Sequence, residues 1–210
     1  MNDPKIIVAL DYDNADSALN FASKVTPDLC KLKVGNELFT NAGPQLVSKL
    51  VDKGFKVFLD LKFHDIPNTV ARACESAMEA ISKYENRPKL IAVTVLTSMD
   101  ETQLNSVGVN NQPKTQVLQL AKLVKECGLD GVVSSAQEVS LIKQYMGIPF
   151  MCVTPGIRPA GSALGDQKRV MTPRDAVEVG SDYLVIGRPI TKSDDPVKTL
   201  HEINESIIVK

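Results

Sequence analysis

The stretch VFLDLKFHDIPNTV, residues 57–70, carries a complete transition from strand to helix. Its apolar opening predicts a strand over Val57–Leu61, and the proline and asparagine near its end introduce a helix over residues 67–84. Side chains alternate between the two faces of a strand, so we expect Asp60 and Lys62 to point to the same side. The stretch therefore predicts charged side chains at the carboxyl end of a strand that leads into a helix.

The same alternation of strand and helix extends along the whole chain. Further strands are predicted over Ile6–Ala9, Leu29–Val34, Leu90–Leu96, Gly131–Val133, Phe150–Val153 and Tyr183–Ile186. Further helices are predicted over residues 14–25, 42–53, 115–127, 136–145, 173–179 and 196–208. Such repeated units favour a parallel sheet with helices outside it. No linker or low-complexity tract interrupts them, so we expect residues 1–210 to form one domain.

Polar residues gather at or just after the carboxyl ends of these strands: Asp11, Lys33, Asp60, Lys62, Thr97, Arg158 and Arg188. A (β/α)8 barrel builds its active site at this end of its strands. An open doubly wound sheet also binds ligands there, but it usually carries a glycine-rich loop after its first strand, where this chain has ALDYDNADSA. We therefore predict an α/β fold of the TIM-barrel type. The count is incomplete, because seven strands are found and a closed barrel of this type needs eight.

The composition indicates a cytoplasmic globular protein. A formal net charge of −1 and a pI of about 6.1 give no global electrostatic basis for binding nucleic acid or a membrane surface. An anionic substrate would have to meet local positive charge instead. The four cysteines, at positions 30, 74, 127 and 152, are too widely spaced for a zinc motif or a disulfide framework. They indicate reduced thiols in the protein core.

The charges around residues 57–70 allow more than one interpretation. Charges in a strand interior are costly unless they are paired or functional, and Asp60 with Lys62 alone would suggest a structural ion pair. Lys33 at the end of another strand and Asp65 on the following loop favour a functional array. A metal site that uses Asp60, His64 and Asp65 is a third interpretation, which is weakened because no second histidine lies nearby in the sequence.

Several segments resemble one known family. DLKFHDIPNT closely resembles the signature of the orotidine 5′-phosphate decarboxylase family. Other similar segments follow in order over nearly the whole chain: IIVALD, KLKVG, IAVTVLTS, GLDGVVSSAQE, VTPGIRP, GDQKR and VIGRPI. The DxKxxD core alone is shared with the related hexulose-phosphate synthase barrels, so the combination of segments carries the resemblance.

The resemblance implies a barrel that converts orotidine 5′-phosphate to UMP without a cofactor or metal. It implies the catalytic residues Lys33, Asp60 and Lys62, joined by Asp65 from the neighbouring subunit of a homodimer. Loss of CO2 from C6 of the pyrimidine leaves a carbanion that the ring delocalises poorly. Lys62 would stabilise and protonate that carbon, while Asp60 would disfavour the substrate carboxylate. Lys33 and Asp65 would fix the position and charge of Lys62.

The resemblance also implies a set of substrate-binding residues. They are Asp11, Lys33, Thr69, Thr97, Arg158, Gln167, Gly187 and Arg188. Asp11 and Lys33 would hold the ribose hydroxyls, and Thr97 would hydrogen-bond the pyrimidine. The last strand would present Gly187 and Arg188 to the phosphate. The polar stretch TPGIRPAGSALGDQKRVM would form a lid from which Gln167 reaches across the phosphate.

One part of the family pattern is missing. Relatives usually carry another strand–loop–helix unit after the helix that follows DIPNT, whereas this chain runs directly into the strand predicted over Leu90–Leu96. The unit would comprise about 20 residues, and its absence accounts for the seven strands. An omission from the sequence, a natural or engineered deletion, and a different closure of the barrel are the possible explanations.

Two other functions stay open on the sequence alone. A related sugar-phosphate barrel, such as a hexulose-phosphate synthase, would need a divalent metal. A ligand-binding remnant without catalysis is also compatible with an incomplete barrel, because removing a strand leaves two unpaired edges.

Overall fold

The computed structural model of the protein describes residues 3–85, 87–161 and 169–208. Seven strands form one parallel sheet: β1 (Ile6–Ala9), β2 (Lys31–Gly35), β3 (Val57–Asp60), β4 (Ile91–Val93), β5 (Gly131–Val133), β6 (Met151–Thr154) and β7 (Tyr183–Ile186). The helices are α1 (Ala15–Ala22), α2 (Asn36–Asp52), α3 (Pro67–Ser82), α4 (Glu101–Ser106), α5 (Pro113–Glu126), α6 (Ala136–Met146), α7 (Pro173–Glu178), α8 (Arg188–Thr191) and α9 (Pro196–Ser206).

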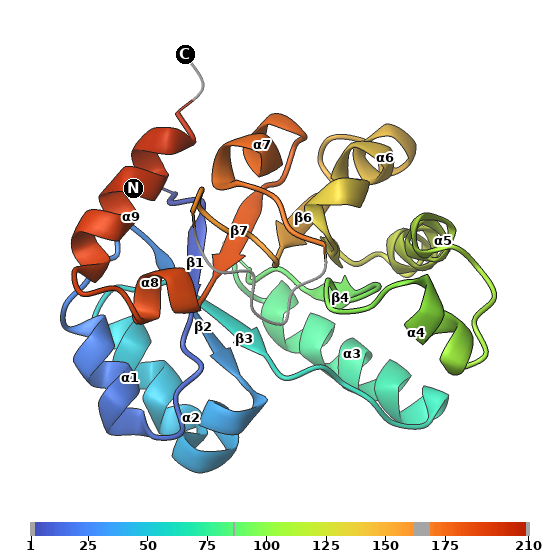
Figure 1. The fold of residues 1–210 in the computed structure, drawn as a ribbon. Coiled ribbons are helices and arrows are strands. Elements are labelled where there is room, and N and C mark those ends of the chain that lie inside the picture. The colour runs from blue at the N-terminus through green and yellow to red at the C-terminus, as the bar shows by residue number, and fades with distance from the viewer. Residues whose placement is uncertain (1–2, 86, 162–168, 209–210) are drawn as a thin grey trace.

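The sheet has the strand order of a barrel. The order is β3-β2-β1-β7-β6-β5-β4, so the first strand of the chain pairs with the last. The helices surround the strands on the outside (Figure 1). The predicted parallel α/β fold is confirmed, and so is the count of seven strands among the described residues.

Successive side chains along a strand point to opposite faces of the sheet, and the two faces pack into two different cores. In β1, Ile6 and Val8 point outward and pack with the helices, whereas Ile7 and Ala9 point into the barrel. There they meet Val133, Val153 and Val185 from β5, β6 and β7, together with partly buried neighbours. These inner side chains fill the barrel and form the base on which a site can be built.

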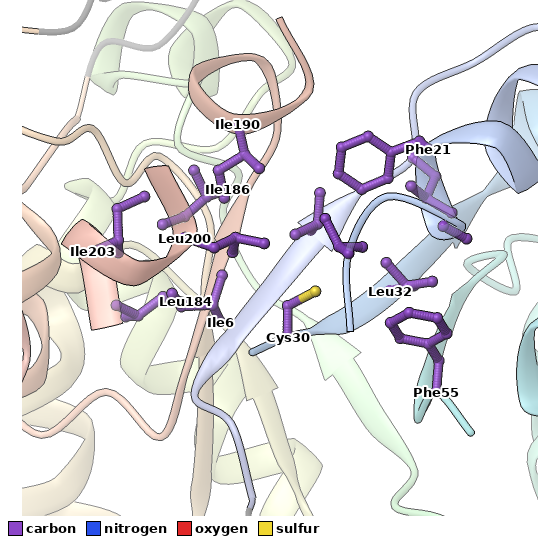
Figure 2. Packing of buried hydrophobic residues seen from close by; sticks show 14 of the residues in the cluster. Ile6, Phe21, Cys30, Leu32, Phe55, Leu184, Ile186, Ile190, Leu200 and Ile203 are labelled. Atoms are coloured by element: carbon purple, nitrogen blue, oxygen red, sulfur yellow. The ribbon is translucent and has the colours of Figure 1, made fainter. Parts of the chain in front are cut away.

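The outer core is continuous around the β1–β7 seam. Figure 2 shows Leu184 and Ile186 of β7 packed with Leu200 and Ile203 of α9, while Phe21 of α1 lies on the other side of β1. Such aliphatic and aromatic side chains each contribute about 1.5–3 kcal/mol when fully buried. This half of the molecule is therefore held firmly.

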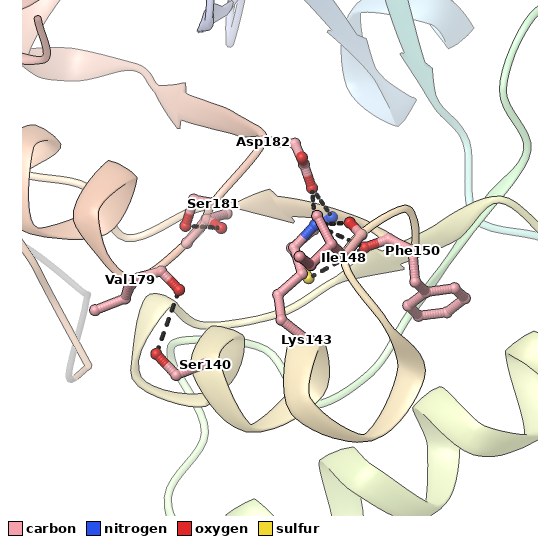
Figure 3. Close-up of polar contacts among 9 residues, drawn as sticks. Ser140, Lys143, Ile148, Phe150, Val179, Ser181 and Asp182 are labelled. Atoms are coloured by element: carbon pink, nitrogen blue, oxygen red, sulfur yellow. Dashed lines mark hydrogen bonds and ion pairs between the residues drawn. The ribbon is translucent and has the colours of Figure 1, made fainter. Parts of the chain in front are cut away.

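Polar contacts fix α6 against the amino ends of β6 and β7. The Lys143 ammonium donates to the carbonyls of Ile148 and Phe150, both at 2.9 Å, and pairs with the Asp182 carboxylate at 2.7 Å (Figure 3). The same carboxylate oxygen accepts from the backbone N–H of Cys152 at 2.7 Å. This network lies at the end of the strands opposite to the predicted site, and we regard it as structural.

The barrel is open between β3 and β4. Both are edge strands of the sheet in the part of the chain that the structure describes. The helix between them, α3, has no buried residue, and Leu59 and Leu96 beside the opening are 43% and 40% exposed. The opening lies where the sequence lacks a strand–helix unit, which accounts for the exposed apolar side chains.

Three details differ from the sequence prediction. Helix α2 begins at Asn36, six residues before the predicted start, because it continues across a kink at Gly43 and Pro44. Helices α4 and α8 were not predicted, since four to six residues are too few to show a helical period. The cysteines are all unpaired, but they are not all core residues, because Cys127 is exposed.

Candidate active site

A cavity of about 360 Å³ opens at the carboxyl ends of the strands. Its lining contains seven of the polar residues predicted from the sequence: Asp11, Lys33, Asp60, Lys62, Thr97, Arg158 and Arg188, together with Gly187. These residues come from the ends of six different strands, and the barrel brings them together because parallel strands all end on the same side.

An alternating series of charges runs along one wall of the cavity. The Lys33 ammonium lies 3.2 Å from an Asp11 carboxylate oxygen and 3.7 Å from Asp60 Oδ2. Lys62 Nζ lies 2.5 Å from Asp60 Oδ1. The side chains of Lys33 and Asp60 are only 12% and 17% exposed, which strengthens their attraction. Asp60 is therefore held between two ammonium groups.

Lys62 reaches this position by an unexpected route. Asp60 and Lys62 both line the cavity, as expected, but strand β3 ends at Asp60, so the alternation of side chains along a strand does not account for Lys62. Lys62 instead has a φ of 46°, in the left-handed region that non-glycine residues rarely adopt. The turn directs its ammonium back to Asp60.

A second lysine of β2 lies far from the cavity lining. Lys31 shares the inner face with Lys33, as the strand alternation predicts, but it is buried near the amino ends of the strands. Its ammonium donates to the Pro4 carbonyl at 3.1 Å and pairs with Asp3 at 2.9 Å. Lys31 is therefore a structural residue.

Two predicted site residues do not line the cavity, and a third falls outside the described residues. Asp65 is exposed on the loop after β3, where its carboxylate accepts from the backbone N–H of Ile66 at 2.6 Å. Thr69 is exposed in the first turn of α3. Gln167 lies outside the described residues, as does the rest of the 162–168 part of the predicted lid. Asp65 and Thr69 thus lie outside the cavity lining of their own chain.

Sequence reasoning missed the apolar part of the cavity. Phe58, Val93, Val133 and Val185 line it from four strands. Phe58 and Val185 precede Asp60 and Gly187 by two residues, and this two-residue spacing is the signal that could have identified them. Ser98, Pro155 and Gly156 add to the lining from the loops after β4 and β6.

The described residues contain no group of three or more His, Cys, Asp or Glu side chains placed to hold a metal ion. The arrangement of Asp60, His64 and Asp65 that the sequence allowed is therefore not formed among them. None of the described helices combines the length and apolar character that crossing a membrane would require.

Comparisons with known proteins agree on one family. The family described as "Orotidine 5'-phosphate decarboxylase / HUMPS family" matches residues 4–84 and 73–203. The chain is 54% identical to the orotidine 5′-phosphate decarboxylase of Pseudoalteromonas translucida, over 97% of both chains. It is 52% identical to that of Vibrio cholerae, over 99% of this chain and 100% of the relative. The crystal structure of orotidine 5′-phosphate decarboxylase from Lactobacillus acidophilus superposes with a TM-score of 0.82 at 37% identity, covering 99% of this chain and 100% of the other.

The comparisons also locate the missing unit. The alignment with the Vibrio cholerae relative extends over 231 positions, whereas this chain has 210 residues, so residues of the relative have no counterpart here. The family match divides into two segments that overlap at residues 73–84, within α3. The division lies just before the opening between β3 and β4.

Proposed function

The chain belongs to the orotidine 5′-phosphate decarboxylase / HUMPS family, and we propose that its charged series performs the decarboxylation. It is a carboxy-lyase that converts orotidine 5′-phosphate to UMP in pyrimidine biosynthesis. The observation that carries the proposal is the sequence of charges from Lys33 through Asp60 to Lys62 in the cavity wall.

Lys62 is the proton donor to C6 in this proposal. Cleavage of the bond between C6 and the carboxyl carbon leaves the electron pair on C6, and CO2 departs. The ammonium of Lys62 stabilises that charge and then transfers a proton to C6, which yields UMP. Asp60 holds the ammonium in place, and Lys33 holds Asp60 from its other oxygen.

Asp60 also acts on the substrate carboxylate. Two negative charges 4 Å apart repel each other by about 4 kcal/mol at an effective dielectric constant near 20. The repulsion is relieved when CO2 leaves, so it contributes to the rate. The low exposure of Asp60 limits its screening by water.

The other end of the cavity binds the phosphate. Arg188 begins α8 directly after β7 and lines the cavity beside Gly187. A Cβ atom on Gly187 would lie 3.4 Å from that of Ala9, an ordinary contact, so the glycine is not required by the packing of the chain itself. Arg158, from the loop after β6, adds a second guanidinium to the lining. Gln167 is proposed to complete this end, with Thr97 at the pyrimidine and Asp11 with Lys33 at the ribose.

A second subunit supplies Asp65 and Thr69 in this proposal. Both residues are exposed and lie outside their own cavity, and the neighbouring Phe63 and Ile66 are 54% and 66% exposed. An exposed apolar surface next to polar residues is typical of a protein interface. A homodimer in which this surface meets the partner's cavity would bring Asp65 to Lys62.

The decisive experiment is the decarboxylation assay on the protein with Lys62→Ala. Removing the proton donor should abolish measurable turnover of orotidine 5′-phosphate, while UMP still binds. Lys56→Ala is the matched control, because Lys56 is an exposed lysine paired with Asp3 at the opposite end of the strands. Near-normal turnover by Lys62→Ala would overturn the mechanism.

Mixing two inactive variants tests the shared site. A homodimer of Lys62→Ala carries one defect in each of its sites, and so does a homodimer of Asp65→Ala. A mixed dimer would contain one site with both defects and one with none, so random exchange of subunits restores about a quarter of the wild-type sites. No recovery after exchange, with dimers present, would show that Asp65 acts within its own chain.

Two broader proposals accompany the mechanism. Residues 1–210 form one domain, because a single sheet joins the first and last strands. The protein works in the cytoplasm without a cofactor, and its four unpaired cysteines support a reducing compartment. Retention of activity after exhaustive treatment with EDTA would distinguish it from a metal-dependent sugar-phosphate enzyme.

A further inference from the structure

A buried ion pair lies beside the cavity and has no part in the chemistry described above. Arg169 Nη1 donates to Glu138 Oε1 at 2.6 Å, and the two side chains are only 10% and 2% exposed. Glu138 lies in the first turn of α6, and Arg169 lies on the segment that returns toward α7. Charges are buried at this depth only when they are paired, so the position of Arg169 is closely defined.

Arg169 holds the backbone at the carboxyl end of β4. Its Nη2 donates to the carbonyls of Val95 at 3.2 Å and Leu96 at 3.1 Å, and its backbone N–H donates to the Thr97 carbonyl at 3.3 Å. Strand β4 has β5 on one side and the opening of the barrel on the other, within the described part of the chain. On the open side of β4, where no described strand pairs with it, the hydrogen bonds from Arg169 support the backbone instead.

The same segment also contacts the loop after β6. The backbone N–H of Met171 donates to the Gly156 carbonyl at 3.3 Å, and the backbone N–H of Arg158 donates to the Met171 carbonyl at 3.0 Å. Gly156 has a φ of 74°, and a Cβ atom there would lie 3.0 Å from the Arg169 carbonyl and 3.1 Å from Thr97 Cγ2. Arg169, Gly156 and Thr97 are therefore closely packed at one side of the cavity.

We propose that Arg169, fixed by Glu138, is a positioning residue that sets the place of Thr97 in the cavity. The proposal rests on the proposed role of Thr97 at the pyrimidine. A guanidinium suits this task because its planar fork donates in several fixed directions at once, to one carboxylate and two carbonyls. A lysine at the same position could not reproduce that geometry.

The pairing also explains why a carboxylate is tolerated at Glu138. Burial raises the pKa of Glu138, and the guanidinium of Arg169 opposes that increase. If Arg169 alone is replaced, the carboxylate stays buried without its partner, and the variant could fail to fold. The double variant Glu138→Gln, Arg169→Gln removes both charges together and avoids this problem.

The test compares this ion pair, which holds the chain after the carboxyl end of β4, with a second ion pair, which holds the amino end of β4. Arg87 donates to both carboxylate oxygens of Asp130 at 2.8 and 2.7 Å, and Asp130 accepts from the backbone N–H of Leu90 at the amino end of β4. Arg87→Gln is therefore the matched control for losing an ion pair that anchors β4. Binding of UMP and kcat/KM for orotidine 5′-phosphate are measured for Arg169→Gln, the double variant and the control.

The expected result separates positioning from general stability. The dissociation constant of UMP should rise about tenfold in Arg169→Gln and in the double variant, the equivalent of one lost hydrogen bond. Their kcat/KM should also fall about tenfold, because displacing Thr97 costs at most the hydrogen bond that its hydroxyl makes. Arg169→Lys should fall between them and the wild type, and Arg87→Gln should keep wild-type values for both.

A double-mutant cycle with Thr97→Val identifies the route of the effect. Thr97→Val should reduce kcat/KM about tenfold in the wild type and far less in the Arg169 variants, whereas its effect should be unchanged in Arg87→Gln. Additive effects, or equal losses in the Arg87 and Arg169 variants, would overturn the proposal. If Thr97→Val alone has no effect, the assignment of Thr97 to the pyrimidine fails, and the UMP affinities still decide whether Arg169 positions the site.

Discussion

Lys62 combines a strained backbone with a central place in the charged series. Its φ of 46° is the one positive φ of a non-glycine residue in the described ranges. A left-handed conformation costs an L-residue about 1–2 kcal/mol, so the surrounding structure must maintain it. Strain of this kind is common at functional sites, and it agrees with a proton donor whose ammonium must face Asp60.

Replacing Lys62 by glycine or alanine should separate strain from chemistry. Both variants lose the ammonium and should lose turnover. Glycine adopts the left-handed region freely, so Lys62→Gly should be more stable than Lys62→Ala by about 1 kcal/mol. Urea unfolding of the two variants measures this difference, and an alanine variant as stable as the glycine variant would contradict the strain.

The Asp60 carboxylate of the wild type should weaken the binding of orotidine 5′-phosphate while raising kcat. In Asp60→Asn the repulsion of about 4 kcal/mol at 4 Å is lost, so kcat should fall by about a thousandfold. Orotidine 5′-phosphate should bind more tightly to this variant. UMP has no carboxylate and is the internal control, so its affinity should change little. Weaker binding of both nucleotides would instead indicate a disturbed cavity.

The amino ends of the strands are joined by a second charged cluster. The Asp3 carboxylate accepts from Lys56 at 2.7 Å, from the Tyr183 hydroxyl at 2.6 Å and from Lys31 at 2.9 Å. Burial tends to raise the pKa of Asp3, but these hydrogen bonds outweigh it and lower that pKa well below its ordinary value. The cluster links β2 and β7 to the chain before β1.

This cluster should stabilise the fold at neutral pH and not in acid. A carboxyl group whose pKa is depressed by folding contributes stability above its unfolded pKa, near 3.9, and loses that contribution as the pH falls through its folded pKa. Asp3→Asn should therefore lower the free energy of unfolding at pH 7, by about 1 kcal/mol or less because the group is half exposed. The difference from the wild type should shrink between pH 4 and pH 2.

Urea unfolding at several pH values makes the measurement. Asp52→Asn, at the exposed end of α2, serves as the control for replacing a surface carboxylate. A deficit of Asp3→Asn that persists unchanged in acid would mean that packing, and not charge, accounts for the loss.

At the scale of elements, the sequence predicted what periodicity and local charge determine. Strands such as Ile6–Ala9 and Tyr183–Ile186 were predicted with their observed bounds, because runs of β-branched residues mark them clearly. The turn at Lys62 was not predictable from alternation, since the strand ends at Asp60 and Lys62 adopts a left-handed backbone conformation. Arg169 was missed for a different reason, because its partners are 31 or more residues away in the sequence.

At the scale of the whole molecule, the opening between β3 and β4 has a cost in stability. It leaves two strand edges unpaired and the apolar residues Leu59 and Leu96 partly exposed. The polar residues of the site still meet, because every strand end that carries them is present. The described chain therefore brings the charged residues of the proposed mechanism together while lacking part of the wall.

Inserting the missing unit should stabilise the protein. The segment of the Vibrio cholerae relative that has no counterpart here would be placed between α3 and β4. Pairing both edges and burying the exposed side chains should add several kcal/mol, which corresponds to a rise in Tm of about 10 °C. A Gly/Ser-rich insert of equal length is the control and should give no increase. Thermal unfolding of the three proteins tests the prediction, and equal Tm values would contradict it.

The opening also changes how the two sides of the cavity are connected. Asp11, Lys33 and Asp60 lie at the carboxyl ends of β1, β2 and β3, whereas Thr97 and Arg158 follow β4 and β6. Among the described strands, the pairing of β1 with β7 is the one junction between these groups. In a closed barrel, a rotation about that junction would break hydrogen bonds at a second one. Among the described strands this chain has no second junction, so the width of the mouth depends on the packing around β1 and β7.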